Sequence, residues 1–146
     1  MEYNVMTAKE YLQQYGEAVR IAERLKTEYD QELLKIDAVR STLGGDGTPH
    51  GTGISRATED KAIRLADKAL ELKDAELEAV RIRQEVFDLI RTVPGEKGDV
   101  LYERYINLKS WGEVAAAVGY SKSRTHDLHN EALDLIKVRT QSDTQV

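Results

Sequence analysis

Two long stretches of the chain repeat apolar side chains at steps of three, four or seven residues. The first runs from Thr7 to Leu43 and the second from about Ser55 to Val93. This spacing predicts two long helices, each with an apolar seam that packs on another helix. The predicted seam of the first comprises Tyr11, Tyr15, Ala18, Ala22, Leu25, Tyr29, Ile36, Val39 and Leu43, with the polar Glu32 among them; that of the second comprises Ala62, Leu65, Ala69, Leu72, Ala79, Val86 and Ile90.

A glycine-rich segment, residues 44–53, separates the two helical patterns and predicts a loop. It lacks the Gly-Lys-Ser/Thr ending of a Walker loop, so phosphate binding of that kind is excluded. Two helices of matched length joined by such a loop fold back into an antiparallel hairpin, which we assign to residues 1–94. Each helix carries a second row of apolar residues that the hairpin does not cover, which implies a further partner, either the C-terminal domain or a second copy of the chain. Of the two, we expect a homodimer formed through this helical arm.

Proline and two glycines mark a second break and predict a linker over residues 95–98. After it, Asp99 is expected to cap a helix that contains Tyr105. Ser110 and Glu113 have the spacing of a capping box and open a short helix, Trp111 to Val118. Gly119 allows a sharp turn, and Ser121 caps a helix that runs to about Val138. The spacing predicts a helix-turn-helix over residues 99–140, followed by a flexible tail, 141–146.

The last of these helices has one apolar and one polar face. At 100° per residue, Thr125 and Leu128 lie on the face that packs on the other helices, together with Ala132, Leu135 and Ile136. The opposite face presents hydrogen-bonding side chains near the helix N-terminus, with cations on its flanks. Such a face fits a helix that reads the DNA major groove, with cations for phosphates and polar groups for base edges. Its residues are Lys122, Ser123, Arg124, His126, Asp127 and Asn130.

Composition narrows the chemistry. Of 146 residues, 40% are hydrophobic, 32% are charged and none is Cys, which excludes disulfides, thiolate catalysis and Cys-based zinc sites. His126 and His129 lie three apart on a helix, but no carboxylate shares their face, so no metal site is expected. No pair of carboxylates stands out for acid–base chemistry. We therefore expect neither catalysis nor a cofactor.

Charge and hydropathy bear on partners and location. The net charge is −5, and residues 99–140 hold six basic and six acidic side chains, so this segment is no basic patch. No apolar run is long enough for a bilayer span, and the first residues lack a signal-peptide pattern. These features predict a cytoplasmic protein without membrane association.

The C-terminal third resembles region four of bacterial sigma factors. It is closer still to the sigma-like phage regulators of the RinA and ArpU type, which control late transcription in phages of Gram-positive bacteria. The resemblance implies that Ser123, His126 and Asp127 contact base edges, and that Lys122 and Arg124 contact phosphates. It covers about 40 residues and is carried by Arg104-Tyr105-Ile106, Ser110-Trp111-Gly112-Glu113-Val114-Ala115, Gly119-Tyr120-Ser121-Lys122-Ser123-Arg124 and Leu128-His129-Asn130-Glu131-Ala132-Leu133.

The sequence thus predicts an all-α protein: a long antiparallel helical hairpin followed by a C-terminal helix-turn-helix domain. The expected function is sequence-specific binding of double-stranded DNA in transcription regulation of phage or prophage genes, with RNA polymerase as a further candidate partner. Two alternatives stay open. One is a phage DNA-packaging protein similar to a small terminase subunit, and the other is a co-regulator that binds RNA polymerase without touching DNA.

Overall fold

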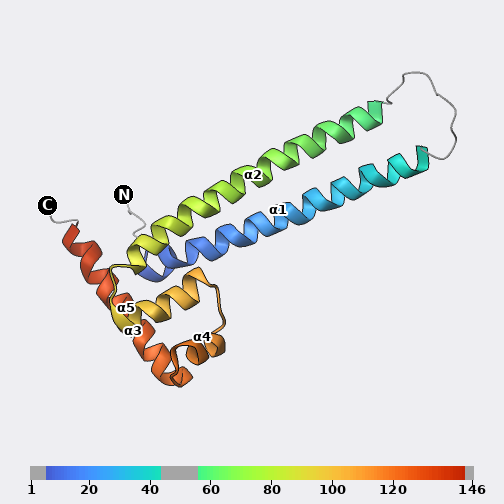
Figure 1. Ribbon diagram of the computed structural model, residues 1–146. Helices are drawn as coiled ribbons and strands as arrows, with labels where there is room; N and C mark the ends of the chain where they lie inside the picture. The colour runs from blue at the N-terminus through green and yellow to red at the C-terminus, as the bar shows by residue number, and fades with distance from the viewer. Residues whose placement is uncertain (1–5, 44–55, 144–146) are drawn as a thin grey trace. The chain divides into compact units, whose positions relative to one another are not determined.

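The computed structural model describes residues 6–43 and 56–143, and it is helical with no strand in those two ranges (Figure 1). The all-α expectation, with a long N-terminal pair of helices, is confirmed. None of the helices in the described ranges is both long and apolar enough to cross a bilayer. The elements are α1 (Ala8–Leu43), α2 (Arg56–Ile90), α3 (Gly95–Leu101), a π-helical turn η1 (Tyr102–Ile106), α4 (Trp111–Val118) and α5 (Lys122–Asp143).

The ends of the two long helices follow from local hydrogen bonds. The hydroxyl of Thr7 accepts from the backbone N–H of Glu10 at 3.1 Å and caps α1. At the end of α2, the Thr92 hydroxyl donates to the carbonyl of Leu89 at 2.6 Å, and the chain leaves the helix three residues earlier than the predicted Val93. The predicted glycine-rich loop, 44–53, lies outside the described residues.

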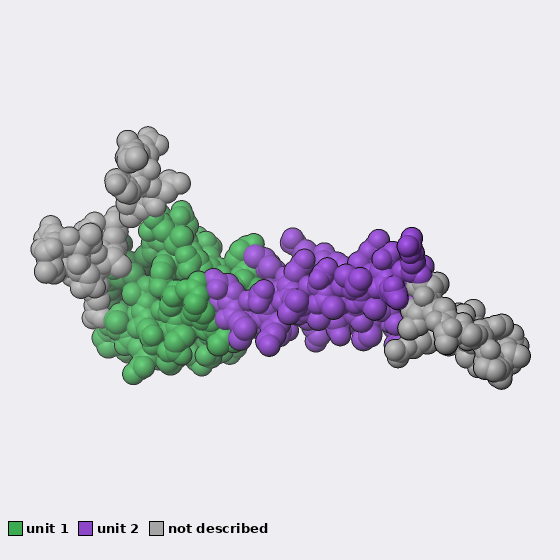
Figure 2. Space-filling view, turned by 90° about the horizontal axis from the view of Figure 1, so that it is seen from above, with its two compact units in different colours: residues 1–18, 79–146 green, residues 19–78 purple. Residues whose placement is uncertain are grey.

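The chain divides into two compact units, coloured separately in Figure 2. Unit 2 comprises Val19–Glu78 and contains the parts of α1 and α2 that run side by side in opposite directions. Its helices face each other with half-buried side chains such as Leu25, Ile36, Leu65 and Leu72. No described side chain in residues 19–38 or 56–78 is fully buried.

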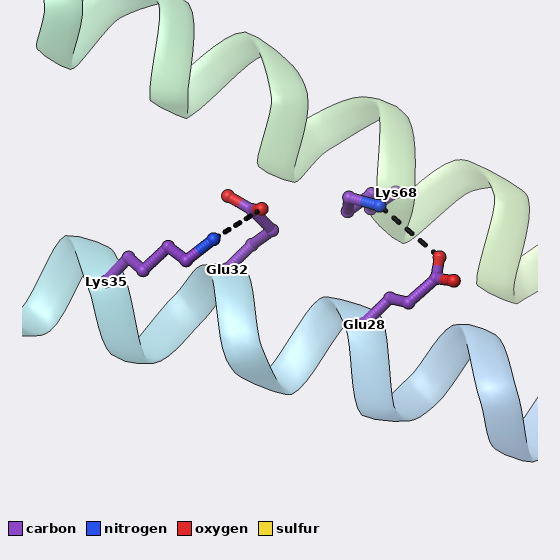
Figure 3. A network of polar contacts seen from close by, with 4 residues as sticks. All are labelled: Glu28, Glu32, Lys35 and Lys68. Atoms are coloured by element: carbon purple, nitrogen blue, oxygen red, sulfur yellow. Dashed lines mark hydrogen bonds and ion pairs between the residues drawn. The ribbon is translucent and has the colours of Figure 1, made fainter.

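One ion pair crosses the helix pair of unit 2, and a second lies along α1 (Figure 3). Lys68 on α2 lies 3.3 Å from the carboxylate of Glu28 on α1. The predicted polar seam position, Glu32, is half-buried and pairs with Lys35 at 3.3 Å. Ala62, predicted for the seam of α2, is instead exposed, because the neighbouring Lys61 takes the half-buried position at this turn of the helix.

Unit 1 comprises the described residues up to Ala18 and from Ala79 onwards, and it holds the hydrophobic core. The ends of α1 and α2 pack there with α3, η1 and α5. Burying each large aliphatic side chain contributes about 1.5–3 kcal/mol, so this core dominates the stability of the unit. Its buried members are Leu12, Val86, Ile90, Val93, Leu101, Tyr105, Ile106, Ala132 and Ile136.

The predicted linker over 95–98 is wrong, because these residues form the first turn of α3. Pro94, in an extended conformation, precedes the helix, and Gly98 is buried against the preceding turn. A Cβ atom on Gly98 would lie 2.2 Å from the carbonyl oxygen of Val93. The expected cap at Asp99 is therefore wrong as well, since Asp99 is an exposed residue inside α3.

The π-helical turn ends α3 and leads into the C-terminal helices. The backbone N–H of Asn107 donates to the carbonyl of Tyr102 at 3.1 Å, the wider bond that defines a π-turn. Leu108 follows in a left-handed conformation with φ 55°. The Arg104 guanidinium donates to the carbonyl of Lys109 at 2.8 Å and holds the chain as it leaves this turn.

The last helix is longer than predicted. α5 continues past Val138 to Asp143, so residues 141–143 of the expected flexible tail are helical. The rest of that tail, 144–146, lies outside the described residues.

Candidate nucleic-acid interface

Two helix caps and one left-handed glycine set where α4 begins, where it ends and where α5 begins, and the sequence indicates all three. The Ser110 hydroxyl accepts from the backbone N–H of Glu113 at 3.3 Å, which caps α4. Gly119 ends α4 in the left-handed region, with φ 78°. The Ser121 hydroxyl then accepts from the backbone N–H of Arg124 at 3.1 Å and caps α5. These predicted caps and the predicted turn residue are confirmed.

The capping box closes in a different way from the expected one. The Ser110 hydroxyl also lies 3.1 Å from the Glu113 carboxylate, to which it donates. The two side chains therefore pair with each other, whereas the expected arrangement has the carboxylate accept from the backbone N–H of Ser110.

Three positions anchor α4 and α5 to one another. Ala115 and Leu128 are buried, and Leu128 packs in a small core with Val100 and Val114. Thr125 is also fully buried, and its hydroxyl donates to the carbonyl of Ser121 at 2.8 Å. A polar residue is tolerated at this core position because that local bond satisfies its hydroxyl.

The six residues singled out from the sequence share one face of α5, and the structure leaves all of them exposed. They come from the first nine residues of the helix, while Thr125, Leu128 and Ala132 hold the opposite face in the core. The N-terminal end of a helix also carries a partial positive charge that favours anions. The exposed set is Lys122, Ser123, Arg124, His126, Asp127 and Asn130.

Trp111 is half-buried, and it lies between this face and the core. Its ring centroid is 4.3 Å from that of His126 and 4.7 Å from that of His129. The guanidinium carbon of Arg104 sits 4.6 Å from the Trp111 ring centroid in a cation–π contact. Trp111 packs on the small core, and it also makes a tilted ring contact with His126, a member of the candidate face, which the sequence did not indicate.

A carboxylate on α5 holds two nearby cations. Glu131 lies 3.4 Å from Lys97 on α3 and 4.0 Å from Arg124. The side chains of these pairs are about half exposed, so each pair contributes little to stability, and a phosphate can compete for the same cations. Lys97 is therefore a cation beside the candidate face that sequence reasoning missed, because it belongs to the residues assigned to the linker.

A buried pair of polar rings was missed as well. His129 is 4% exposed and Tyr105 is 5% exposed. The Tyr105 hydroxyl lies 2.6 Å from Nε2 of His129. Burial lowers the pKa of His129 to about 4 and raises the pKa of Tyr105 to about 12. The burial of His129 could have been predicted from its position, since it follows the inward-facing Thr125 by four residues and lies on the same side of the helix.

Metal coordination finds no support in the described ranges. They contain no group of three or more His, Cys, Asp or Glu side chains placed to hold an ion. Nε2 of His129 forms a hydrogen bond with the Tyr105 hydroxyl, so this nitrogen is not available to coordinate a metal together with His126.

Comparison of the chain with protein-family models, with curated proteins and with solved structures found no match.

Proposed function

We propose that α4 and α5 form a helix-turn-helix of the sigma region-four type, and that the protein is a sequence-specific DNA-binding transcription regulator of phage or prophage genes. In this proposal the N-terminal part of α5 enters the major groove. Lys122 and Arg124 contact phosphates, while Ser123, His126, Asp127 and Asn130 face base edges.

The observation that carries the proposal is the exposure of all six of these side chains on one face of a helix whose other face is buried. The short α4 and the left-handed Gly119 precede that helix, in the order expected of a helix-turn-helix. A helix used only as a structural cap has no need of two cations and four hydrogen-bonding groups grouped at its exposed start.

Charge limits the affinity that one copy can reach. Asp127 lies on the face itself, and Glu131 already holds Arg124 and Lys97. Asp127 can accept from the N4 amino group of cytosine, but it repels phosphates. A single copy should therefore bind DNA weakly, and a second copy or RNA polymerase would supply the remaining contacts.

The test begins by selecting bound fragments from a random duplex pool, with and without RNA polymerase. The dissociation constant for a selected duplex is then measured at several salt concentrations for the native protein and for Lys122→Ala and Arg124→Ala. Each variant should weaken binding and lower the salt slope by about one, because each removes one phosphate contact.

Arg83→Ala is the matched control, since Arg83 is an exposed cation of the same unit located on α2. This control should bind like the native protein. If Lys122→Ala and Arg124→Ala also bind like the native protein, the groove assignment fails. Enrichment of sequences only when polymerase is present would favour the co-regulator, and a ring of many copies would favour the packaging protein.

A further inference from the structure

The face of α2 that points away from α1 in unit 2 carries a row of large aliphatic side chains. Ile63, Leu70 and Leu77 are 60%, 61% and 58% exposed. They follow one another at intervals of seven residues, which returns a helix to nearly the same face. The exposed Ala66 lies beside them. We call Ile63, Ala66, Leu70 and Leu77 the outer row.

The outer row is distinct from the seam between α1 and α2. Between Ile63 and Leu77 the half-buried residues of α2 are Leu65, Lys68, Ala69, Leu72 and Ala75, and Lys68 reaches Glu28 of α1 (Figure 3). At 100° per residue all of them except Ala69, which lies to the side, are roughly opposite Leu70 on the helix. The hairpin therefore leaves the outer row uncovered.

Opposite charges border the two edges of the outer row. Asp67 and Asp74 lie along one edge, and Lys73 lies along the other. All three side chains are exposed. A seven-residue apolar repeat with charged flanks is the pattern by which helices choose a partner and its direction.

We propose that the outer row binds the outer row of a second copy of this chain, with the two α2 helices parallel. In a parallel pair, the acidic edge of each helix faces the basic edge of the other, and Lys73 of one copy lies beside Asp74 of the second copy. Ile63, Leu70 and Leu77 each meet their own counterpart. An antiparallel pair would place Asp67 of one copy beside Asp74 of the second copy, where like charges repel.

The row is short, and this sets the expected strength. From Ile63 to Leu77 it spans about 21 Å at 1.5 Å per residue. A seam of this length buries less surface than the interface of a permanent dimer does. The association is a concentration-dependent equilibrium. It involves unit 2 alone and stands whether or not α5 binds DNA.

Sedimentation of the full chain without DNA tests the association, at concentrations from about 1 μM to about 1 mM. The native chain should shift from monomer to dimer across this range. Leu70→Asp should raise the dissociation constant at least about tenfold, because a carboxylate in the centre of the seam would lose its water. Leu34→Asp is the control and should leave the equilibrium unchanged, since Leu34 is 67% exposed and lies on α1. A native chain that stays monomeric, or two variants with equal effects, would overturn the proposal.

Single cysteines test the direction, because the chain has none of its own. In a parallel pair, Ile63→Cys should form an intersubunit disulfide with itself under mild oxidation, faster than Leu34→Cys does. In an antiparallel pair about Leu70, a mixture of Ile63→Cys and Leu77→Cys would give mainly the mixed disulfide. Dominance of the mixed product contradicts the parallel arrangement.

Discussion

At the scale of single residues, the hydrogen bond between Tyr105 and His129 fixes the state of both rings. Burial keeps His129 neutral, and Lys9 and His126 lower its pKa further through their charges. A neutral imidazole can accept at Nε2, so the Tyr105 hydroxyl donates across the 2.6 Å separation. The raised pKa of Tyr105 keeps its proton in place over the whole neutral range. The pair thus satisfies two buried polar groups without introducing a charge.

His129 should titrate with a pKa of about 4 in the folded protein. The NMR shift of its Cε1 proton should therefore stay constant between pH 7 and pH 5. Since the unfolded value is about 6.5, the unfolded chain binds the proton first as the pH falls. The contribution of His129 to the free energy of unfolding is complete above pH ~6.5 and is lost as the pH falls toward ~4.

Urea unfolding at a series of pH values measures this loss. The fall in stability between pH ~6.5 and pH ~4 should be smaller for His129→Gln, which cannot take up a proton. A His129 resonance that titrates near 6.5 would show that the ring is accessible to solvent, and the buried pair would then be wrong.

At the scale of elements, the boundaries set by local chemistry were predictable and those set by packing were not. The caps at Ser110 and Ser121 and the turn at Gly119 depend on residues within a few positions of each other. The start of α3 depends instead on how closely Gly98 approaches the carbonyl of Val93. From sequence alone, a proline followed by two glycines indicates a break, and nothing local indicates that the second glycine is buried.

The same distinction holds within the candidate site. Helical periodicity predicted the exposed face of α5 from Lys122 to Asn130, and the structure leaves these side chains exposed. The ion pair of Glu131 with Lys97 and the ring contact of Trp111 with His126 join residues from different helices. Such contacts require the tertiary packing, which periodicity does not supply.

Gly98→Ala should destabilise unit 1 by about 1–3 kcal/mol, because a methyl group there must push apart backbone that is already in contact. The midpoint of chemical unfolding measures the effect. Gly112→Ala is the control, since a Cβ atom there would meet only the Lys122 side chain, at 3.4 Å. If the two variants were equally stable, the close approach of α3 to Val93 would be in error.

At the scale of the whole molecule, burial is unevenly divided between the two units. The sequence predicted the hairpin and a domain boundary after residue 94. The observed units instead divide each long helix, because residues 1–18 and 79–94 belong to the same unit as the C-terminal helices. Leu12 and Val86, at the ends of the two long helices, are fully buried with residues of α3, η1 and α5. Periodicity placed Val86 in the apolar seam but did not single out Leu12, and it could not show that the partners of these residues include the C-terminal helices.

Backbone amides of unit 2 should exchange with solvent faster than those of the unit 1 helices, because no described side chain of residues 19–38 and 56–78 is fully buried. Hydrogen-exchange mass spectrometry measures this difference. Peptides from residues 56–78 should also gain protection as the protein concentration rises, if the outer row pairs as proposed. Equal protection of both units at low concentration would contradict the uneven burial.

The position of Trp111 has a practical consequence. It is the only tryptophan of the chain, and its indole is in contact with the ring of His126, a member of the face proposed to meet DNA. Indole emission responds to a neighbouring imidazole and to the loss of water around it. The intrinsic fluorescence of Trp111 should therefore change when a ligand binds this face, and binding can be followed without attaching a dye.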